Sequence, residues 1–160
     1  MSTVAAPRPL ATAAAVLAFD FGTRRIGVAV GDRGVGIAHP VTTIEGDDNA
    51  ARFAAIDAIV AEWRPGTLVV GLPFALDGTE HEMTRLARKF ARRLEARYGL
   101  PVEFVDERLS STAAEEALRE AGVKPRAGNF RENRGRVDRL AAQILLQQYL
   151  DEAPRSGANR

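Results

Sequence analysis

Three acidic residues, Asp20, Glu107 and Asp138, stand where the sequence pattern predicts the ends of secondary-structure elements. Asp20 and Glu107 each follow an apolar run that predicts a strand, and Asp138 falls in the first turn of the last predicted helix. In open α/β sheets, functional sites form beyond the carboxyl ends of the strands. We therefore expect the three carboxylates to converge at one edge of a sheet.

Carboxylates gathered in this way repel one another when ionised, and they are the hard oxygen ligands that Mg²⁺ and Mn²⁺ prefer. Such ions activate water and stabilise the leaving oxygen in phosphodiester cleavage. The chain has no cysteine, which excludes a disulfide scaffold, a zinc–thiolate site, an iron–sulfur cluster and thiol catalysis. Its two histidines, His39 and His81, stand in unrelated segments and do not suggest a zinc pair.

Each of these acids also has a purely structural explanation. The two that follow strands could be ordinary strand-end residues, and Asp138 suits a helix N-terminus because the helix dipole favours a negative charge there. Counting from Asp138 in steps of three and four gives an apolar stripe of Ala142, Leu145 and Tyr149. Asp138 therefore heads the helix face that we expect to pack on the sheet, where a carboxylate needs a partner or a metal.

The basic residues suggest a phosphate-bearing partner, although the net charge is only +1. Only two of the 22 basic residues are lysines; a GC-rich genome would explain this bias, and arginine also suits bidentate contacts to phosphate. One cluster lies on the polar face of a helix predicted over Met83–Tyr98, and another lies in a segment predicted as a loop over 124–136. We expect both to grip a polynucleotide backbone. Their members are Arg85, Arg88, Lys89, Arg92, Arg93 and Arg97, and then Lys124, Arg126, Arg131, Arg134 and Arg136.

The segment DFGTRRIG, from Asp20 to Gly27, predicts a short turn between hairpin strands. Such a turn can present backbone N–H groups to phosphate, although Gly22 could serve the turn alone. Similar segments occur in sugar-kinase and actin-like ATPases. Those enzymes need a second lobe to close over the nucleotide, and a chain of 160 residues leaves no room for one.

Five apolar runs predict strands. Three of them, at Val16–Phe21, Arg25–Val30 and Gly36–Ile44, are separated by short turns and predict a meander of hairpins. Thr67–Leu72 is apolar on both faces, which is typical of a central strand covered on both sides. Val102–Val105 is the last predicted strand.

The spacing of apolar residues predicts four helices. The first follows candidate N-caps at residues 47–49 and ends before Pro65. The second covers Met83–Tyr98, with a capping box of Thr79 and Glu82. A short helix over 112–122 and a last helix over Val137–Leu150 follow.

This order predicts an α/β fold of ribonuclease H-like architecture, a mixed five-stranded sheet with helices on both faces. We expect one domain over residues 16–151, with disordered tails at 1–15 and 152–160. The first strand and the two later ones should be central and neighbouring, so that Asp20 and Glu107 emerge close together. No apolar run reaches the roughly 18 residues of a membrane span.

Four blocks of the sequence resemble the signatures of the YqgF family, in the right order and over about residues 16–151. Members of this family are known as Holliday junction resolvases and as nucleases of pre-16S ribosomal RNA, and they have a ribonuclease H-like fold. The blocks are LAFDFGTRRIGVAVGD (Leu17–Asp32), VVGLPFALDGTE (Val69–Glu80), VDERLSS (Val105–Ser111) and VDRLAAQILLQQYLD (Val137–Asp151).

The resemblance implies that Asp20, Glu107 and Asp138 bind Mg²⁺ or Mn²⁺ and are catalytic. It also matches two arginines of the family to Arg25 and Arg108, which could contact phosphate or form salt bridges with the nearby Asp32 and Asp106. Our candidates for nucleic-acid contacts are Arg24, Arg25, Arg108, Arg134 and Arg136.

We therefore expect a cytoplasmic, metal-dependent nuclease, acting as a monomer or homodimer on structured RNA at the 5′ end of pre-16S ribosomal RNA. Four-way DNA junctions are the alternative substrate. Two other classes are a nucleotide-binding phosphotransfer domain and a non-catalytic nucleic-acid adaptor. The missing second lobe argues against the first class, and the three retained acids argue against the second. We expect no membrane partner.

Overall fold

Five strands form the central sheet of the computed structural model, which describes residues 14–75, 77–106 and 130–152, with side chains from residue 134 onward in the last range. They are β1 (Ala15–Asp20), β2 (Arg25–Asp32), β3 (Ala38–Glu45), β4 (Thr67–Leu72) and β5 (Val102–Asp106). Their order across the sheet is β3-β2-β1-β4-β5. β2 is antiparallel to β1 and β3, whereas β4 is parallel to β1 and β5. The predicted mixed, ribonuclease H-like sheet is confirmed.

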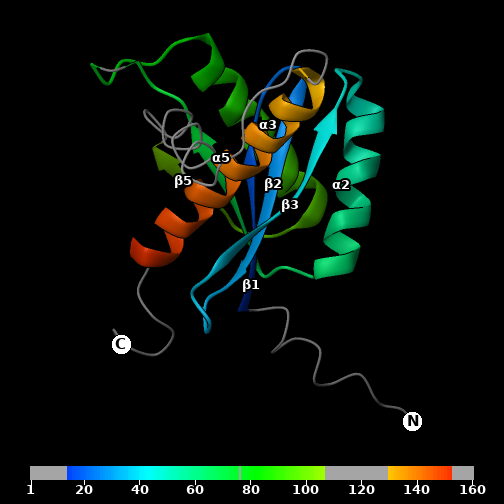
Figure 1. Cartoon of the computed structure of the whole chain (residues 1–160), viewed down its shortest axis with the longest axis vertical. Coiled ribbons are helices and arrows are strands. Elements are labelled where there is room, and N and C mark those ends of the chain that lie inside the picture. The colour runs from blue at the N-terminus through cyan, green and yellow to red at the C-terminus, as the bar shows by residue number, and fades with distance from the viewer. Residues whose placement is uncertain (1–13, 76, 107–129, 153–160) are drawn as a thin grey trace.

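Helices cover both faces of this sheet, as predicted. Two helices, α2 (Asn49–Trp63) and α3 (Glu82–Tyr98), pack on one face, and α5 (Phe130–Glu152) crosses the other (Figure 1). No helix in the described ranges is long and apolar enough to cross a membrane. The short helix predicted over 112–122 and nearly all of both predicted tails lie outside the described residues.

The two faces of the sheet carry side chains of different size. Along β2, the residues on the α2 and α3 side are large, namely Ile26, Val28 and Val30. The alternate positions face α5 and are small, because side chains alternate between the faces of a strand. They are Gly27, Ala29 and Gly31. The small residues form a trough in which α5 lies close to the sheet.

Gly27 is the position where α5 comes closest. A Cβ atom at Gly27 would lie 2.0 Å from the carbonyl oxygen of Asp138, a separation that no side chain can adopt. Only glycine therefore allows the main chain of the helix to touch the strand here. Farther along β2, a Cβ at Gly31 would lie 2.8 Å from Leu150 Cδ1, so the trough continues beneath the second half of the helix.

The last helix begins earlier than predicted, at Phe130 rather than Val137. The prediction of a loop through residue 136 is therefore wrong for 130–136, because arginine and glutamate form helices readily even without an apolar stripe. Gly135, which favoured a loop in the sequence, is buried and packs on β3, where the Thr43 hydroxyl donates to its carbonyl oxygen over 2.7 Å. Asp138 consequently lies well inside the helix, and the helix-terminus explanation of this acid is wrong.

The start of α3 also differs from the prediction. The capping box pairs His81 with Thr84, because the His81 side chain accepts from the first turn and the Thr84 hydroxyl accepts from the His81 N–H. Thr79, which the sequence placed in a box with Glu82, instead donates to the Asp77 carboxylate over 2.8 Å. The predicted N-cap of α2 is confirmed in Asp48.

We predict that Gly27→Ala destabilises the protein by about 1–3 kcal/mol, because the added methyl group must push α5 off the sheet. Gly135→Ala is the matched control, since its Cβ would find its nearest neighbour at 3.5 Å. Alanine is also the better helix former, so this variant should be about 0.5–1 kcal/mol more stable than the parent. Urea unfolding measures both changes. Equal stability of the two variants would contradict the close contact at Gly27.

Candidate nuclease site

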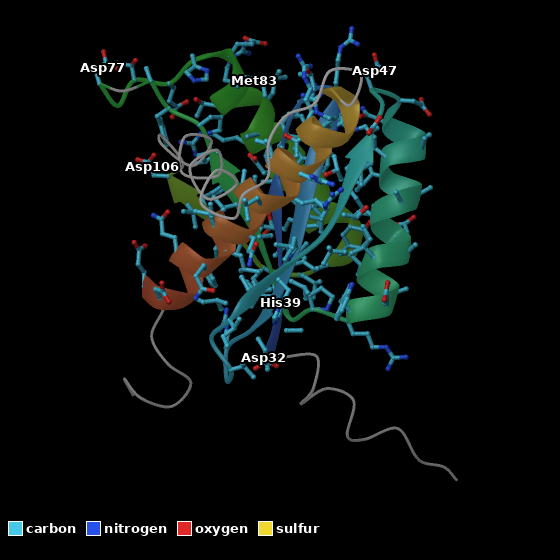
Figure 2. The ribbon with its side chains drawn as sticks, viewed as in Figure 1. Asp32, His39, Asp47, Asp77, Met83 and Asp106 are labelled. Carbon is cyan, nitrogen blue, oxygen red and sulfur yellow. The ribbon has the colours of Figure 1, made fainter. Side chains whose placement is uncertain are left out.

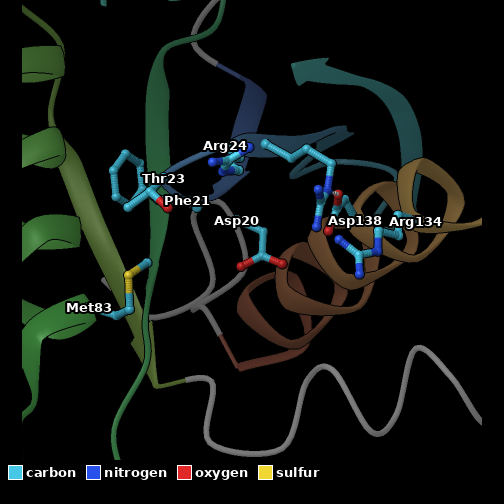
Figure 3. Close-up of a pocket in the computed structure, with 9 residues that line it drawn as sticks. Asp20, Phe21, Thr23, Arg24, Met83, Arg134 and Asp138 are labelled. Atoms are coloured by element: carbon cyan, nitrogen blue, oxygen red, sulfur yellow. Dashed lines mark hydrogen bonds and ion pairs between the residues drawn. The ribbon is translucent and has the colours of Figure 1, made fainter. Parts of the chain in front are cut away.

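A pocket of about 300 Å³ opens where β1 ends, at the sheet edge that the sequence predicted. Its lining comes from the turn between β1 and β2, from the first turn of α3 and from α5 (Figure 3). The lining residues are Asp20, Phe21, Gly22, Thr23, Arg24, Arg25, Met83, Arg134 and Asp138.

Two of the three predicted carboxylates meet in this pocket. Asp20 is the last residue of β1, whereas Asp138 belongs to α5, the last described helix in the sequence. In Figure 3 the Asp20 carboxylate lies between Met83 on one side and Asp138 on the other. The position of Asp138 depends directly on Gly27, because the main-chain carbonyl oxygen of Asp138 lies against this glycine.

Glu107 and Arg108, the other candidates near this edge, lie outside the described residues. β5 ends at Asp106, which lies at the same end of the molecule as Met83 and opposite Asp32 (Figure 2). The first strand and the two later ones are neighbours, as predicted, in the order β1-β4-β5, but β5 lies at the edge of the sheet and not in its centre. Two strand spacings separate β1 from β5 by roughly 10 Å.

Arg25 and Asp138 form an ion pair across the pocket, with 2.6 Å between Nε and Oδ2. The side chains are 29% and 23% exposed, so the pair is shielded from much of the solvent. The sequence offered Asp32 as the alternative partner of Arg25. That alternative is wrong, because the two residues lie at opposite ends of β2 and Asp32 accepts instead from the backbone N–H groups of Gly34 and Val35.

Burial dominates the electrostatics of Asp138. It raises the pKa of this carboxyl above its usual value, and the hydrogen bond and charge of Arg25 offset only part of the effect. The charges of Arg134 and Arg139 act in the same direction as Arg25. The ionised carboxylate therefore depends on the cations around it.

The other predicted arginines divide into two groups. Arg24 and Arg134 line the pocket, as Arg25 does, whereas Arg136 is half-buried in α5 and is not part of the lining. Sequence reasoning missed Met83, which it named only as the first residue of the helix predicted over Met83–Tyr98. It also missed Arg52, whose guanidinium lies beneath the turn and donates to two of its carbonyl oxygens. The only sequence signal for Arg52 was a charged residue beside Phe53 on the apolar face of the helix.

The carboxylates suit a hard divalent cation. Asp20 and Asp138 offer oxygen ligands of the kind that Mg²⁺ and Mn²⁺ take, and no histidine lines the pocket. Among the residues that the structure describes, no group of three or more acidic, histidine or cysteine side chains is arranged to hold a metal. Glu107 stays the predicted third ligand.

Comparison with known proteins identifies the family. The model of the RuvX family, described as Holliday junction resolvase, matches residues 14–152. The chain belongs to this family. RuvX is the family that the sequence blocks pointed to under the name YqgF.

Two RuvX relatives match this chain over most of their length. A protein of Methylobacillus flagellatus is 51% identical over 91% of this chain and 97% of its own, and one of Dechloromonas aromatica is 54% identical over 85% and 90%. Both are named "Putative pre-16S rRNA nuclease". Among solved structures, Thermus thermophilus RuvC in complex with a Holliday junction substrate is 18% identical, with a TM-score of 0.49 over 86% of this chain and 93% of its own.

We predict that Arg25→Gln raises the pKa of Asp138 still further, because it removes the strongest interaction that lowers it. A carboxyl group with a raised pKa weakens folding when it is ionised. The variant should therefore be less stable than the parent at pH 7, and the difference should shrink as the pH falls through the pKa of Asp138. Carbon-detected NMR titration and urea unfolding, both in metal-free buffer, measure the two effects.

Arg24→Gln is the control for this experiment, since Arg24 lines the same pocket without contributing to the pKa shift of Asp138. It should leave both the titration and the stability profile of Asp138 unchanged. An unaltered pKa of Asp138 in the Arg25 variant would show that the ion pair does not form in solution.

Proposed function

We propose that this RuvX protein is a metal-dependent nuclease that cleaves phosphodiester bonds in structured RNA, in the processing of the 5′ end of pre-16S ribosomal RNA. The observation that carries the proposal is the meeting of Asp20 and Asp138 in one arginine-lined pocket. The names of the two relatives supply the substrate, since both align with this chain over 90% or more of their length.

In this proposal Asp20, Asp138 and Glu107 hold Mg²⁺ or Mn²⁺. When bound, such an ion supplies an activated water and stabilises the leaving oxygen. Arg25 fixes the orientation of the Asp138 carboxylate through its Nε–H. Arg24 and Arg134 bring positive charge to the pocket, where a substrate phosphate would lie. Met83, in the first turn of α3, forms another part of the pocket wall.

A four-way DNA junction is the second candidate substrate, and the description of the family model favours it. RNA and DNA present the same phosphate group to the carboxylates, so the pocket alone accommodates both. A homodimer would suit the two cuts of a symmetric junction, whereas a monomer would suit single cuts in RNA. Processing of ribosomal RNA would place the protein in the cytoplasm.

The outer face of α3 is the proposed contact for the nucleic-acid backbone beyond the pocket. Three of its arginines are occupied by ion pairs within the protein, namely Arg85 with Glu82, Arg88 with Glu80 and Arg97 with Asp57. Three other cations on this helix are exposed and form no ion pair with any described residue. They are Lys89, Arg92 and Arg93.

We predict that Asp20→Asn abolishes cleavage and leaves the fold intact. Removing one carboxylate lowers the repulsion at the site, so the melting temperature in metal-free buffer should stay the same or rise. Cleavage of a pre-16S RNA fragment and of a four-way junction should be compared with Mg²⁺, with Mn²⁺ and with a chelator. Asp32→Asn, at the opposite end of the sheet, should retain activity. Parental cleavage by the Asp20 variant would refute the nuclease assignment of this site.

We also predict that neutralising Lys89, Arg92 and Arg93 together, each to Gln, weakens RNA binding and makes it less sensitive to salt. Each lost phosphate contact reduces the slope of log K against log salt by about 0.7 for single strands, so the slope should fall by about two. The matched control neutralises the paired arginines Arg85, Arg88 and Arg97, which removes the same charge. Fluorescence anisotropy between 50 and 300 mM salt, about the range in which screening changes strongly, measures both. Equal losses in the two triple variants would show a nonspecific charge effect.

A further inference from the structure

Arg52 is a buried cation whose guanidinium donates to backbone carbonyl groups, with the carboxylate of Asp47 acting on it through its charge. Its residue is 5% exposed, and a buried guanidinium is costly unless its N–H groups are bonded. Its two terminal nitrogens donate to backbone carbonyl oxygens, over 2.9 Å to Thr23 and 2.7 Å to Gly22. The guanidinium also lies 5.2 Å from the centre of the Phe21 ring. Both terminal nitrogens of this charged side chain of α2 therefore hold the turn that follows Asp20.

These two hydrogen bonds fix the direction of the backbone N–H groups in the turn. In a trans peptide the C=O and N–H groups point in opposite directions, and the described chain contains no cis peptide. Because the carbonyl groups of Gly22 and Thr23 point toward Arg52, the N–H groups of Thr23 and Arg24 point away from it. Neither N–H donates to a backbone acceptor in the described ranges, and both residues lie outside the strands.

The same turn lines the candidate site. Gly22, Thr23 and Arg24 are lining residues of the pocket that contains Asp20 and Asp138. The turn is tight, since a Cβ at Gly22 would lie 2.6 Å from the carbonyl oxygen of Arg25. Successive N–H groups that point the same way form an anion-binding concavity, and here it would stand beside the arginines of the pocket.

We propose that the N–H groups of Thr23 and Arg24 form a phosphate-binding nest, and that Arg52 is the positioning residue that keeps them directed into the pocket. The ligand is a phosphate group, and the nest takes one of its non-bridging oxygens next to Asp20. This inference rests on the proposed nuclease function for the identity of the ligand, which is the phosphate of the substrate backbone. The proposed contact is made by main-chain N–H groups of the protein, so replacing the side chains of the turn would not remove it.

The test follows the amide signals of Thr23 and Arg24 by ¹⁵N NMR during titration with inorganic phosphate. In the parent protein both signals should shift together and saturably. In Arg52→Met, which keeps an apolar stem over Phe21 and removes the donors, the apparent Kd should weaken about tenfold, the loss of one good hydrogen bond to a charged group. Arg97→Gln is the control, because Arg97 packs on Phe53 of α2 and pairs with Asp57 without touching the turn.

A second arm titrates the Asp20→Asn variant, which should not cleave RNA, with a short RNA oligonucleotide. This arm distinguishes binding of a backbone phosphate from binding of free phosphate. Binding at the nest should then shift the same two amides. If the Arg52 variant does not fold, the titration of the parent protein still decides the matter. Absence of a saturable shift at Thr23 and Arg24, or an undiminished shift in a folded Arg52 variant, would overturn the proposal.

The two proposals can fail separately. If phosphate shifts the Thr23 and Arg24 amide signals saturably and Asp20→Asn cleaves RNA like the parent, the phosphate nest is supported and the nuclease assignment is refuted. If Asp20→Asn loses cleavage but phosphate shifts neither amide signal, the nuclease assignment is supported and the phosphate nest is refuted. In a folded Arg52 variant that cleaves RNA, the nest requires a higher KM with kcat changed much less, whereas a general structural defect would lower the amount of active protein.

Discussion

The contact between α5 and β2 at Gly27 determines the depth at which the helix lies on the sheet. Arg25 lies two residues before Gly27 and therefore on the same face of the strand. The helix that rests on Gly27 consequently brings Asp138 directly within reach of the Arg25 guanidinium. A side chain at position 27 would separate the helix from the strand and the aspartate from its partner. The ion pair of the pocket therefore depends on the absence of a side chain at position 27.

The opposite wall of the pocket depends on packing between aromatic rings. Phe90 of α3 stacks on Phe21 with 4.8 Å between ring centres and meets Phe19 edge to face at 5.8 Å. These two rings flank Asp20 in the sequence, so both neighbours of the carboxylate are anchored on the same helix. Rigid support of this kind holds a reacting group in place before the substrate arrives. The packing of α5 on the sheet therefore depends on a missing side chain, whereas the packing of α3 depends on large aromatic rings.

Local patterns in the sequence were enough to predict the five strands, the mixed sheet and the meeting of Asp20 and Asp138 at one end of it, but not the place of Asp138 within its helix. Strand ends and helical stripes depend on short-range periodicity, which a single sequence carries. The start of α5 could not be predicted, because residues 130–136 are mostly polar and a glycine among them suggests a loop as readily as a buried helix position. The partner of Arg25 and the burial of Arg52 depend on contacts between distant segments, and no local pattern signals them.

The ion pair joins residues that are 113 positions apart in the chain, and one of them lies on the last described helix. At the usual rate of about 5–20 residues per second, the ribosome finishes Asp138 roughly 6–23 s after Arg25. The strands and the turn that follows Asp20 can form during this interval, but the second carboxylate is still missing. A growing chain therefore cannot assemble the pocket until α5 has been made, although all five described strands precede this helix in the sequence.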